Sequence, residues 1–452
     1  MYNSLLFLST EPSNQLNADI DVFDINWMLS LKFGLYSMKR VFPQRVQNSC
    51  QSFIAATFCL VFLPLPPAHA GPEGGEVVGG AGSINQSGST TTINQASDRM
   101  AIDWQSYNVG ADERVHYIQP DSSSVSLNRI LSSHGSQIHG RIDANGQVFL
   151  VNPNGVFFGK DSVINVGGIL ASGLSLDPND FMNGDFAFSA MDGTDGMVIN
   201  AGLINAASGG NVALLGQQVQ NDGMISAQLG SVNLAAGKEA IVTFDGEGLL
   251  GVQVTQSILQ DDIGVDAGVI NNGDITAEDG QILLTASASQ AIFSQAVNAG
   301  EVKQATSVVV DADGSFTLSA GANVVNTGAL SVSGDTGGAL VILGENVTSS
   351  GDILADSASG EVAGSVEVHS MDTTLIAEAG RVSTSAANGV GGDIKLLGDK
   401  VGVFDQSVVA ADGTYGGGQV LIGGDQTGSN PLVRNAQFIY LAENAEVTAS
   451  AD

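Results

Sequence analysis

Two short phrases recur along this chain at intervals of about twenty residues. One is Asn-x-Gly leading into an alternating stretch, as in GLINA from Gly202 and GMISA from Gly223. The other is Gly followed by apolar residues at alternate positions, as in GNVAL from Gly210 and GSVNL from Gly230. Alternation at period two over short runs is typical of β-strands. Two strands per repeat, joined by Gly and Asn turns, predict the coils of an all-β solenoid.

In such a solenoid, equivalent residues of successive coils stack on one another. The phrases recur downstream at Asn271, Gly280, Asn298, Gly314, Asn326, Gly338, Gly364, Gly392 and Gly418. We therefore expect Val212, Val232, Ile282 and Leu340 to form one internal column. Asn is expected in the turns because its side chain can bond the backbone and it tolerates left-handed geometry, and Gly because it supplies positive φ.

Composition narrows the class of protein. Of 452 residues, 43% are hydrophobic, which is enough for a large core, and the net charge is −32. Nucleic-acid binding needs clusters of Lys and Arg, and the 15 present form none, so no nucleic-acid partner is expected. A membrane β-barrel needs aromatic girdles, against 6% aromatic residues here, and the 58 glycines exclude helical repeats.

A secretory signal peptide is predicted for residues 38–70. It has a basic start after Met38, an apolar run from Phe53 to Leu65, and the small-x-small site Ala68-His69-Ala70. Cleavage after Ala70 would leave Gly71 as the first residue. A membrane anchor is the alternative, but the apolar run is too short to span a bilayer.

Residues 1–37 do not resemble the start of a signal peptide, so they are interpreted as an over-extended start or a signal extension. Both cysteines, Cys50 and Cys59, lie in the part expected to be removed. The mature protein is therefore expected to hold together by packing alone.

The segment 71–190 is less regular and contains Trp104, Tyr107 and Tyr117. A solenoid exposes unpaired edges and an open core at its end, which must be capped. We expect these three aromatic side chains to pack inside an N-terminal cap rather than to form a ligand cage.

Ordered phrases across residues 80–320 resemble the haemagglutination-activity, or two-partner-secretion, domain of filamentous haemagglutinin and the high-molecular-weight adhesins. The phrases are INQ at Ile93, YNVG at Tyr107, QP at Gln119, SLNRIL at Ser126, ANGQVFLVNPNG at Ala144 and NVGGILAS at Asn165. The resemblance implies a right-handed parallel β-helix with a cap, exported through an outer-membrane barrel transporter that reads the N-terminal domain. It places the secretion domain at 71–320 and further β-helix repeats, expected to be truncated, at 321–452.

The turn Asn152-Pro153-Asn154-Gly155 separates the apolar runs VFLV and VFF. Pro fixes φ, and Asn and Gly suit a turn, with left-handed geometry expected at Asn154. The turn is predicted to be the corner that sets the register of the first coils. The resemblance adds that it belongs to the element the transporter recognises; that it is only a coil corner is the alternative. Family members often carry an earlier NPNL as well, which is absent here, so the matching transporter subgroup stays open.

No catalytic residue, cofactor site or metal site is predicted. His134 and His139 are five residues apart on a Ser/Gly-rich segment, without HExxH or a Cys cluster, and neither a nucleophile elbow nor a P-loop occurs. Stray carboxylates such as Asp261 and Asp262 are expected to face solvent.

The sequence is thus interpreted as a secreted, cell-surface adhesin that reaches the outside through the periplasm and the outer membrane. Its expected partners are the barrel transporter and a glycan or protein on a host or neighbouring cell. The alternatives are a β-helical glycan-active enzyme, which needs a groove with clustered carboxylates, and the stalk of a contact-dependent toxin-delivery protein lacking its toxin.

Overall fold

The computed structural model describes residues 71–244, 250–256, 268–285, 323–360, 362–377, 379–430 and 433–451. The chain separates into two units between Ala68 and His69, and the description concerns the second. The predicted signal peptide, the phrases at Asn298 and Gly314, and the carboxylates Asp261 and Asp262 lie outside the described residues.

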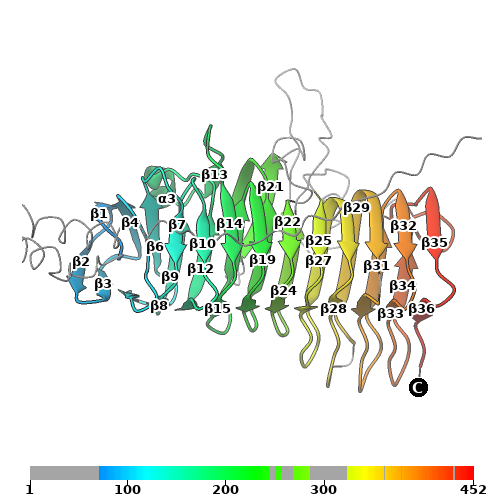
Figure 1. Cartoon of the computed structure of the whole chain (residues 1–452). Helices are drawn as coiled ribbons and strands as arrows, with labels where there is room; N and C mark the ends of the chain where they lie inside the picture. Colours follow the sequence, from blue (N-terminus) through cyan, green and yellow to red (C-terminus); the bar gives the residue numbers. More distant parts are fainter. Residues whose placement is uncertain are drawn as a thin grey trace, which may run out of the picture. The chain divides into compact units, whose positions relative to one another are not determined.

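The second unit is a parallel β-helix whose coils stack side by side (Figure 1). Each complete coil contributes one strand to each of three parallel ladders, which we call the first, second and third ladder in chain order. The first and second ladders, with β1, make up a 20-stranded sheet, and the third ladder belongs to a 13-stranded sheet, counted over the described residues. The predicted fold class is therefore confirmed.

The first ladder contains β4 (Arg99–Trp104), β6 (Val125–Ile130), β9 (Gln147–Val151), β12 (Gly168–Ser172), β16 (Val212–Gly216), β19 (Ser231–Ala236), β24 (Gln281–Thr285), β27 (Ala339–Ser349), β29 (Ser365–Ile376), β31 (Asp393–Leu397) and β34 (Gln419–Ile422). The second contains β7 (Ser136–Ile138), β10 (Val156–Phe158), β14 (Met197–Asn200), β17 (Gln218–Asn221), β22 (Val269–Asn271), β25 (Val324–Asn326), the later halves of β27 and β29, β32 (Lys400–Val403) and β35 (Phe438–Leu441).

The third ladder contains β3 (Thr90–Gln95), β5 (Arg114–Ile118), β8 (Arg141–Ala144), β11 (Val163–Val166), β15 (Leu203–Ala206), β18 (Met224–Ser226), β23 (Asp274–Thr276), β26 (Leu330–Ser331), β28 (Asp352–Leu354), β30 (Arg381–Ser383), β33 (Val408–Ala410) and β36 (Glu446–Thr448). Each complete coil contains three strands, whereas the sequence predicted two. The strands missed belong to the second ladder, such as Val269–Asn271, which ends at the Asn of an Asn-x-Gly phrase that was interpreted as a turn.

The interior of the coils is a continuous column of aliphatic side chains. Val212 pairs with Val232, Val232 with Ile282, and Ile282 with Leu340, as predicted, and all four are buried. Burying the same face of every coil in this way provides the main stabilisation of the fold.

The recurring glycines are required for a different reason than expected. Those of the Asn-x-Gly phrases, such as Gly223 and Gly273, do not have positive φ. A Cβ at Gly273 would instead overlap the carbonyl oxygen of Gly223, and one at Gly223 would overlap that of Gly202. Close approach of successive backbones, rather than left-handed geometry, selects glycine at these positions.

The Asn residues of the same phrases form a buried ladder along the helix. Each donates from Nδ2 to the next coil, from Asn200 to Asn221 and on to Asn271 at 2.8 Å each, then to Asn326 at 2.9 Å. Asn326 closes the series on Ser349 Oγ at 3.0 Å. The prediction that Asn bonds the turn backbone also holds, because Asn200 accepts from the amide of Gly202.

The N-terminal end is closed by antiparallel strands. β1 (Glu76–Gly79) pairs with β4, and β2 (Gly82–Ser87) pairs with β3. The aromatic side chains of Trp104, Tyr107 and Tyr117 are at most 1% exposed, with the first two edge to face at 5.5 Å between ring centres. The prediction that they pack inside a cap is confirmed.

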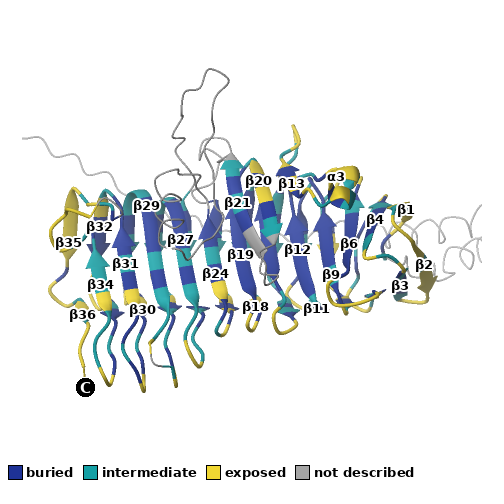
Figure 2. Ribbon diagram, turned by 180° about the vertical axis from the view of Figure 1, so that it is seen from behind, coloured by how far each residue is buried: buried dark blue, intermediate teal, exposed yellow. Residues whose placement is uncertain are grey.

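A second core lies outside the coils, on the outward face of the first ladder. It is covered by α3 (Pro178–Asn183) and by an antiparallel sheet of β13 (Ala187–Ser189), β20 (Glu239–Phe244) and β21 (Leu250–Gln256). Phe149 packs there at 5.9 Å from Phe181 and 5.8 Å from Phe186, ring centre to ring centre. As Figure 2 shows, β9 and β12 are buried on both faces, whereas β35 is exposed.

Candidate secretion element

The turn Asn152-Pro153-Asn154-Gly155 is the corner between β9 and β10, where the first ladder passes to the second. The amide of Asn154 donates to Oδ1 of Asn152 at 3.0 Å, and the amide of Gly155 donates to the carbonyl of Asn152 at 2.8 Å. The Asn152 side chain thus replaces a backbone acceptor inside the turn. The structure confirms that this motif joins the two apolar strands.

The corner is bonded to the coil before it through both asparagine side chains. Asn152, which is fully buried, donates from Nδ2 to the carbonyl of His134 at 3.0 Å and to Oγ of Ser136 at 3.1 Å. Asn154 donates from Nδ2 to the carbonyl of Ser132 at 2.9 Å. The segment that receives these bonds, 132–136, lacks an Asn-Pro-Asn motif of its own, and in the sequence it was considered only for His134 as a metal ligand.

The corner also meets the coil that follows it. The amide of Gly196 donates to the carbonyl of Pro153 at 3.1 Å. Gly155 has φ of 100°, and a Cβ on it would lie 2.9 Å from the carbonyl oxygen of Met197. The left-handed position of the turn is therefore Gly155, and the expectation that it is Asn154 is wrong. Asn154 is selected by its hydrogen bonds.

Beside the corner, the cap contains a buried polar network. Oδ1 of Asn128, from the SLNRIL phrase, accepts from Trp104 Nε1 at 3.0 Å and from the Tyr117 hydroxyl at 2.9 Å. The hydroxyls of Tyr117 and Tyr107 lie 2.8 Å apart. Burial raises the pKa of both phenols well above the usual value of 10. Both therefore remain neutral hydrogen-bonding groups at any physiological pH.

Ion pairs link successive coils of the same region on the outside. Arg129 makes two bonds to Asp103, of 2.8 and 2.6 Å, from one coil to the next. Asp143 accepts from both Arg114 and Arg141 at 2.6 Å. Partial burial alone would raise the pKa of Asp143, but the two arginines lower it. The Arg129–Asp103 and Arg114–Asp143 pairs bridge adjacent strands and so favour the native register, whereas Arg141 lies on the same strand as Asp143.

The structure places only the last of the predicted cleavage residues. Gly71 is partly exposed, and a Cβ placed on it would lie 3.7 Å from Thr91 Oγ1. Ala68 and Ala70 lie outside the described residues. Two residues after Gly71, the amide of Glu73 donates to the carbonyl of Ser106 at 2.8 Å. The cap therefore begins almost directly at the predicted cleavage site.

Over the part of the chain that the structure describes, His, Cys, Asp and Glu side chains form no group of three or more with the spacing of a metal site. His134 and His139 both lie on the surface. Within the same residues, no helix has the length and apolarity needed to cross a bilayer.

Comparison with known proteins places this geometry in a family. The chain is 36% identical in sequence to the heme/hemopexin-binding protein of Haemophilus influenzae over 216 residues. The aligned region covers 45% of this chain and 23% of that protein. A second heme/hemopexin-binding protein from that species is 43% identical over 86 residues, 19% of this chain and 9% of the relative. The matches thus span less than a quarter of either relative.

Among solved structures, the HMW1 secretion domain from Haemophilus influenzae superposes with a TM-score of 0.59 at 26% identity, over 84% of both chains. The family model for the TPS secretion domain matches residues 68–332, which include the cap, the NPNG corner and the outer layer. Because this match covers more than half of the chain, the protein belongs to the two-partner-secretion exoproteins and carries their secretion domain.

Proposed function

We propose that this protein crosses the outer membrane through a dedicated barrel transporter that reads its N-terminal domain, and then acts as an adhesin at the cell surface. The observation that carries the export step is the TPS secretion domain over residues 68–332. Expression with and without the transporter tests it. The protein should reach the medium only with the transporter, and equal release in both strains would contradict the proposal.

The NPNG corner is proposed as part of the element that the transporter recognises. Its two asparagines bond the coil before it and Pro153 bonds the coil after it, so the corner determines how three successive coils meet. The proposed secretion domain spans 71–320, and 321–452 are further coils displayed after export.

The signal peptide 38–70 is proposed to direct the chain into the periplasm first. The folded cap begins within a few residues of this site, because the amide of Glu73 bonds the carbonyl of Ser106. Sequencing the amino terminus of secreted protein should give Gly71. A different first residue would move the cleavage site, and a retained leader would refute cleavage.

Attachment is proposed to be a binding function without catalysis, directed at a glycan or protein on a host or neighbouring cell. Stacked coils present a long, regular surface on which identical contacts can repeat, which suits multivalent binding. Cells that export the chain should adhere to a surface that transporter-deficient cells do not bind.

A second candidate function rests on the relatives' names, which state that they bind heme and hemopexin. The same surface-displayed chain would then capture heme or its carrier. Titrating the purified protein with hemin and with hemopexin separates this function from adhesion, since an adhesin alone would bind neither.

A further inference from the structure

The outward face of the first ladder changes character between its middle and its C-terminal coils. One column of paired residues runs from Leu283 through Val341 to Glu367, Lys395 and Leu421. Two apolar positions are thus followed by two charged ones. In the neighbouring column, His369 lies between Leu343 and Leu397.

The substituted side chains form a compact charged cluster. Nε2 of His369 lies 2.6 Å from Oε1 of Glu367, and Nζ of Lys395 lies 3.1 Å from Oε2 of the same carboxylate. His369 is only 1% exposed. Ionisable groups in a partly buried cluster lose hydration, and aliphatic residues of similar size, as in the preceding coils, would be no less stable. Stability alone does not account for this cluster.

The cluster forms the floor of a cleft of about 490 Å³. Its sides combine carboxylates and amides with aliphatic groups. Among the residues that line it are Asp393, Gln419, Asp425, Asn430, Leu397 and Leu421. The floor is formed by the outward faces of β29, β31 and β34, which are held rigidly by the ladder pairing.

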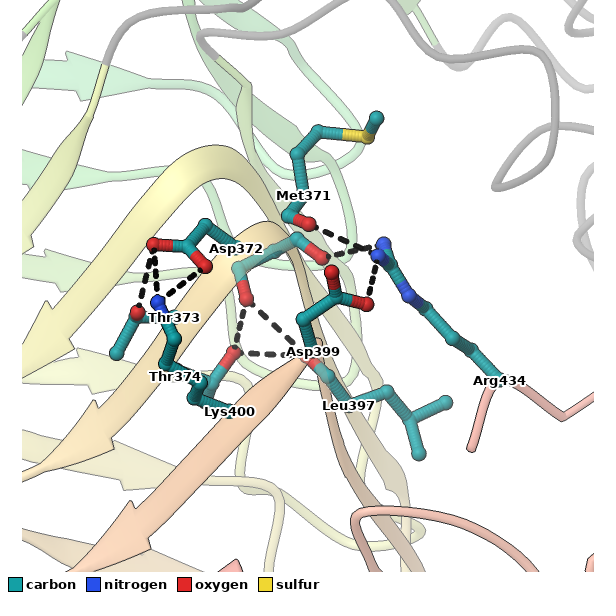
Figure 3. A network of polar contacts seen from close by, with 9 residues as sticks. Met371, Asp372, Thr373, Thr374, Leu397, Asp399, Lys400 and Arg434 are labelled. Atoms are coloured by element: carbon teal, nitrogen blue, oxygen red, sulfur yellow. Dashed lines mark hydrogen bonds and ion pairs between the residues drawn. The ribbon is translucent and has the colours of Figure 1, made fainter. Parts of the chain in front are cut away.

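Arg434 follows the lining residue Val433 and is bonded to β29 and to the turn between β31 and β32 (Figure 3). Its guanidinium donates to the carbonyls of Ser370 at 3.0 Å and Met371 at 2.9 Å and also pairs with Asp399. The Asn435 side chain donates to the carbonyl of Gly428 at 3.0 Å and so holds these two residues of the chain together. The cleft is therefore formed before any ligand arrives, which lowers the entropic cost of binding.

We infer that this cleft binds a neutral saccharide unit of a surface glycan. Side-chain amides and carboxylates are planar groups that can bond two adjacent hydroxyls, and the partly exposed Leu421 offers apolar surface to the C–H face of a sugar ring. Three carboxylates against one lysine and one histidine disfavour sialylated or sulfated sugars. The inference rests on the attachment function proposed above and specifies its ligand.

The cluster also keeps the Glu367 carboxylate ionised. Burial alone would raise the pKa of Glu367, but the bonds and charges of His369 and Lys395 lower it to about 2. A general acid at a glycosidic bond needs a raised pKa and a proton to give. Glu367 has neither at neutral pH, so it cannot serve as that general acid, and its ionised carboxylate is suited to accepting hydrogen bonds from a ligand.

Two lysines offer a matched test. Lys395 pairs with Glu367 inside the cleft and Lys400 pairs with Asp372 outside it, each across 28 residues, at 3.1 and 2.8 Å. Purified protein is screened by saturation-transfer NMR against neutral oligosaccharides ending in glucose, galactose, mannose or N-acetylglucosamine, and against sialylated and sulfated forms. The best binder is then titrated calorimetrically.

We expect a neutral oligosaccharide to bind, with at least tenfold weaker affinity for Lys395→Ala and Gln419→Ala, and a change below twofold for Lys400→Ala. Circular dichroism checks that each variant is folded. If Lys395→Ala is misfolded, the affinity of Gln419→Ala tests the inference, because the side chain of Gln419 is exposed and its loss should not affect folding. Absence of neutral binders, a preference for acidic sugars, or cleft variants that bind like the parent would each overturn the inference. These assays use purified protein and need no transporter. A negative binding result therefore does not contradict the export proposal, and a failure of export does not contradict a positive binding result.

Discussion

The coils that contain β9 to β19 and the coils that contain β29 to β34 share one backbone plan but differ on the outward face of the first ladder. In the early coils this face carries Phe149, Leu170 and Leu215, which are buried under α3 and the three-stranded sheet. In the late coils the equivalent positions include Glu367, Lys395 and Leu421, which are partly exposed.

The comparison teaches that the internal columns determine the β-helix and that the outward columns differentiate its regions. A strand buried on both faces reads as a continuous apolar run, as in QVFLV, whereas DIKLL alternates charged and apolar residues at its start. The early coils thus gain a second core, and the late coils gain a surface available for contacts.

The largest expected effect is loss of the second core. Phe149→Ala should lower the free energy of unfolding by about 3–5 kcal/mol, since it removes a fully buried ring packed on two others. Leu421→Ala, in the same column but partly exposed, should cost less than about 1.5 kcal/mol. Denaturant unfolding of both variants measures the difference. An equal loss of unfolding free energy in the two variants would mean that burial under the outer layer does not add to stability.

The next effect concerns the buried network of the cap. Asn128→Ala would leave Trp104 Nε1 and the Tyr117 hydroxyl without their shared acceptor, at a cost of about 2–4 kcal/mol for two buried donors. Asn233→Ala, which changes a buried Asn of β19 outside the cap, serves as the comparison and should leave the cap transition unchanged. Thermal unfolding followed by Trp104 fluorescence reports the cap directly. A cap that melts unchanged would show that packing alone maintains it.

The smallest effect is confined to the late coils and depends on pH. The pKa of Glu367 is about 2 in the folded protein against 4.5 unfolded, so its contribution is complete above pH 4.5 and is lost as pH falls toward 2. We expect roughly 2–3 kcal/mol to disappear over this window. Glu367→Gln should flatten that slope, and an unchanged slope would contradict the ion-pair geometry.

The internal columns and the cap could be predicted from the sequence because both produce a local pattern of residues. Alternating apolar residues fix Val212 above Val232, and unusual aromatic density marks Trp104 and its neighbours. The outer layer left no such mark. The insertion that carries α3 and β13 interrupts the repeat, and a run such as VALL does not show what covers its second face.

The NPNG corner was predicted as a turn, but its partners were not. Its asparagines bond carbonyls at Ser132 and His134, and a backbone carbonyl is present at every residue, so no side-chain pattern could reveal them. For the same reason the glycine repeats were correctly located but misinterpreted. Their requirement is the backbone of the next coil, which a single sequence does not show.

The central claim is that the coils around the NPNG corner carry the export element, whereas the coils after residue 320 do not. Two buried asparagines test it with matched changes. Asn152 makes two side-chain bonds to the preceding coil, at 3.0 and 3.1 Å, and Asn326 makes bonds of 2.9 and 3.0 Å to its neighbouring coils. Both side chains are fully buried, so each alanine substitution should destabilise its coil by about 1–3 kcal/mol.

The measurement is the amount of each variant in the medium when the transporter is co-expressed, with periplasmic protein measured in parallel. The account predicts that Asn152→Ala accumulates in the periplasm, whereas Asn326→Ala is released like the parent, because each coil contacts only its neighbours. If both variants are released equally, or both are retained equally, the NPNG corner has no special part in export and the central claim is wrong.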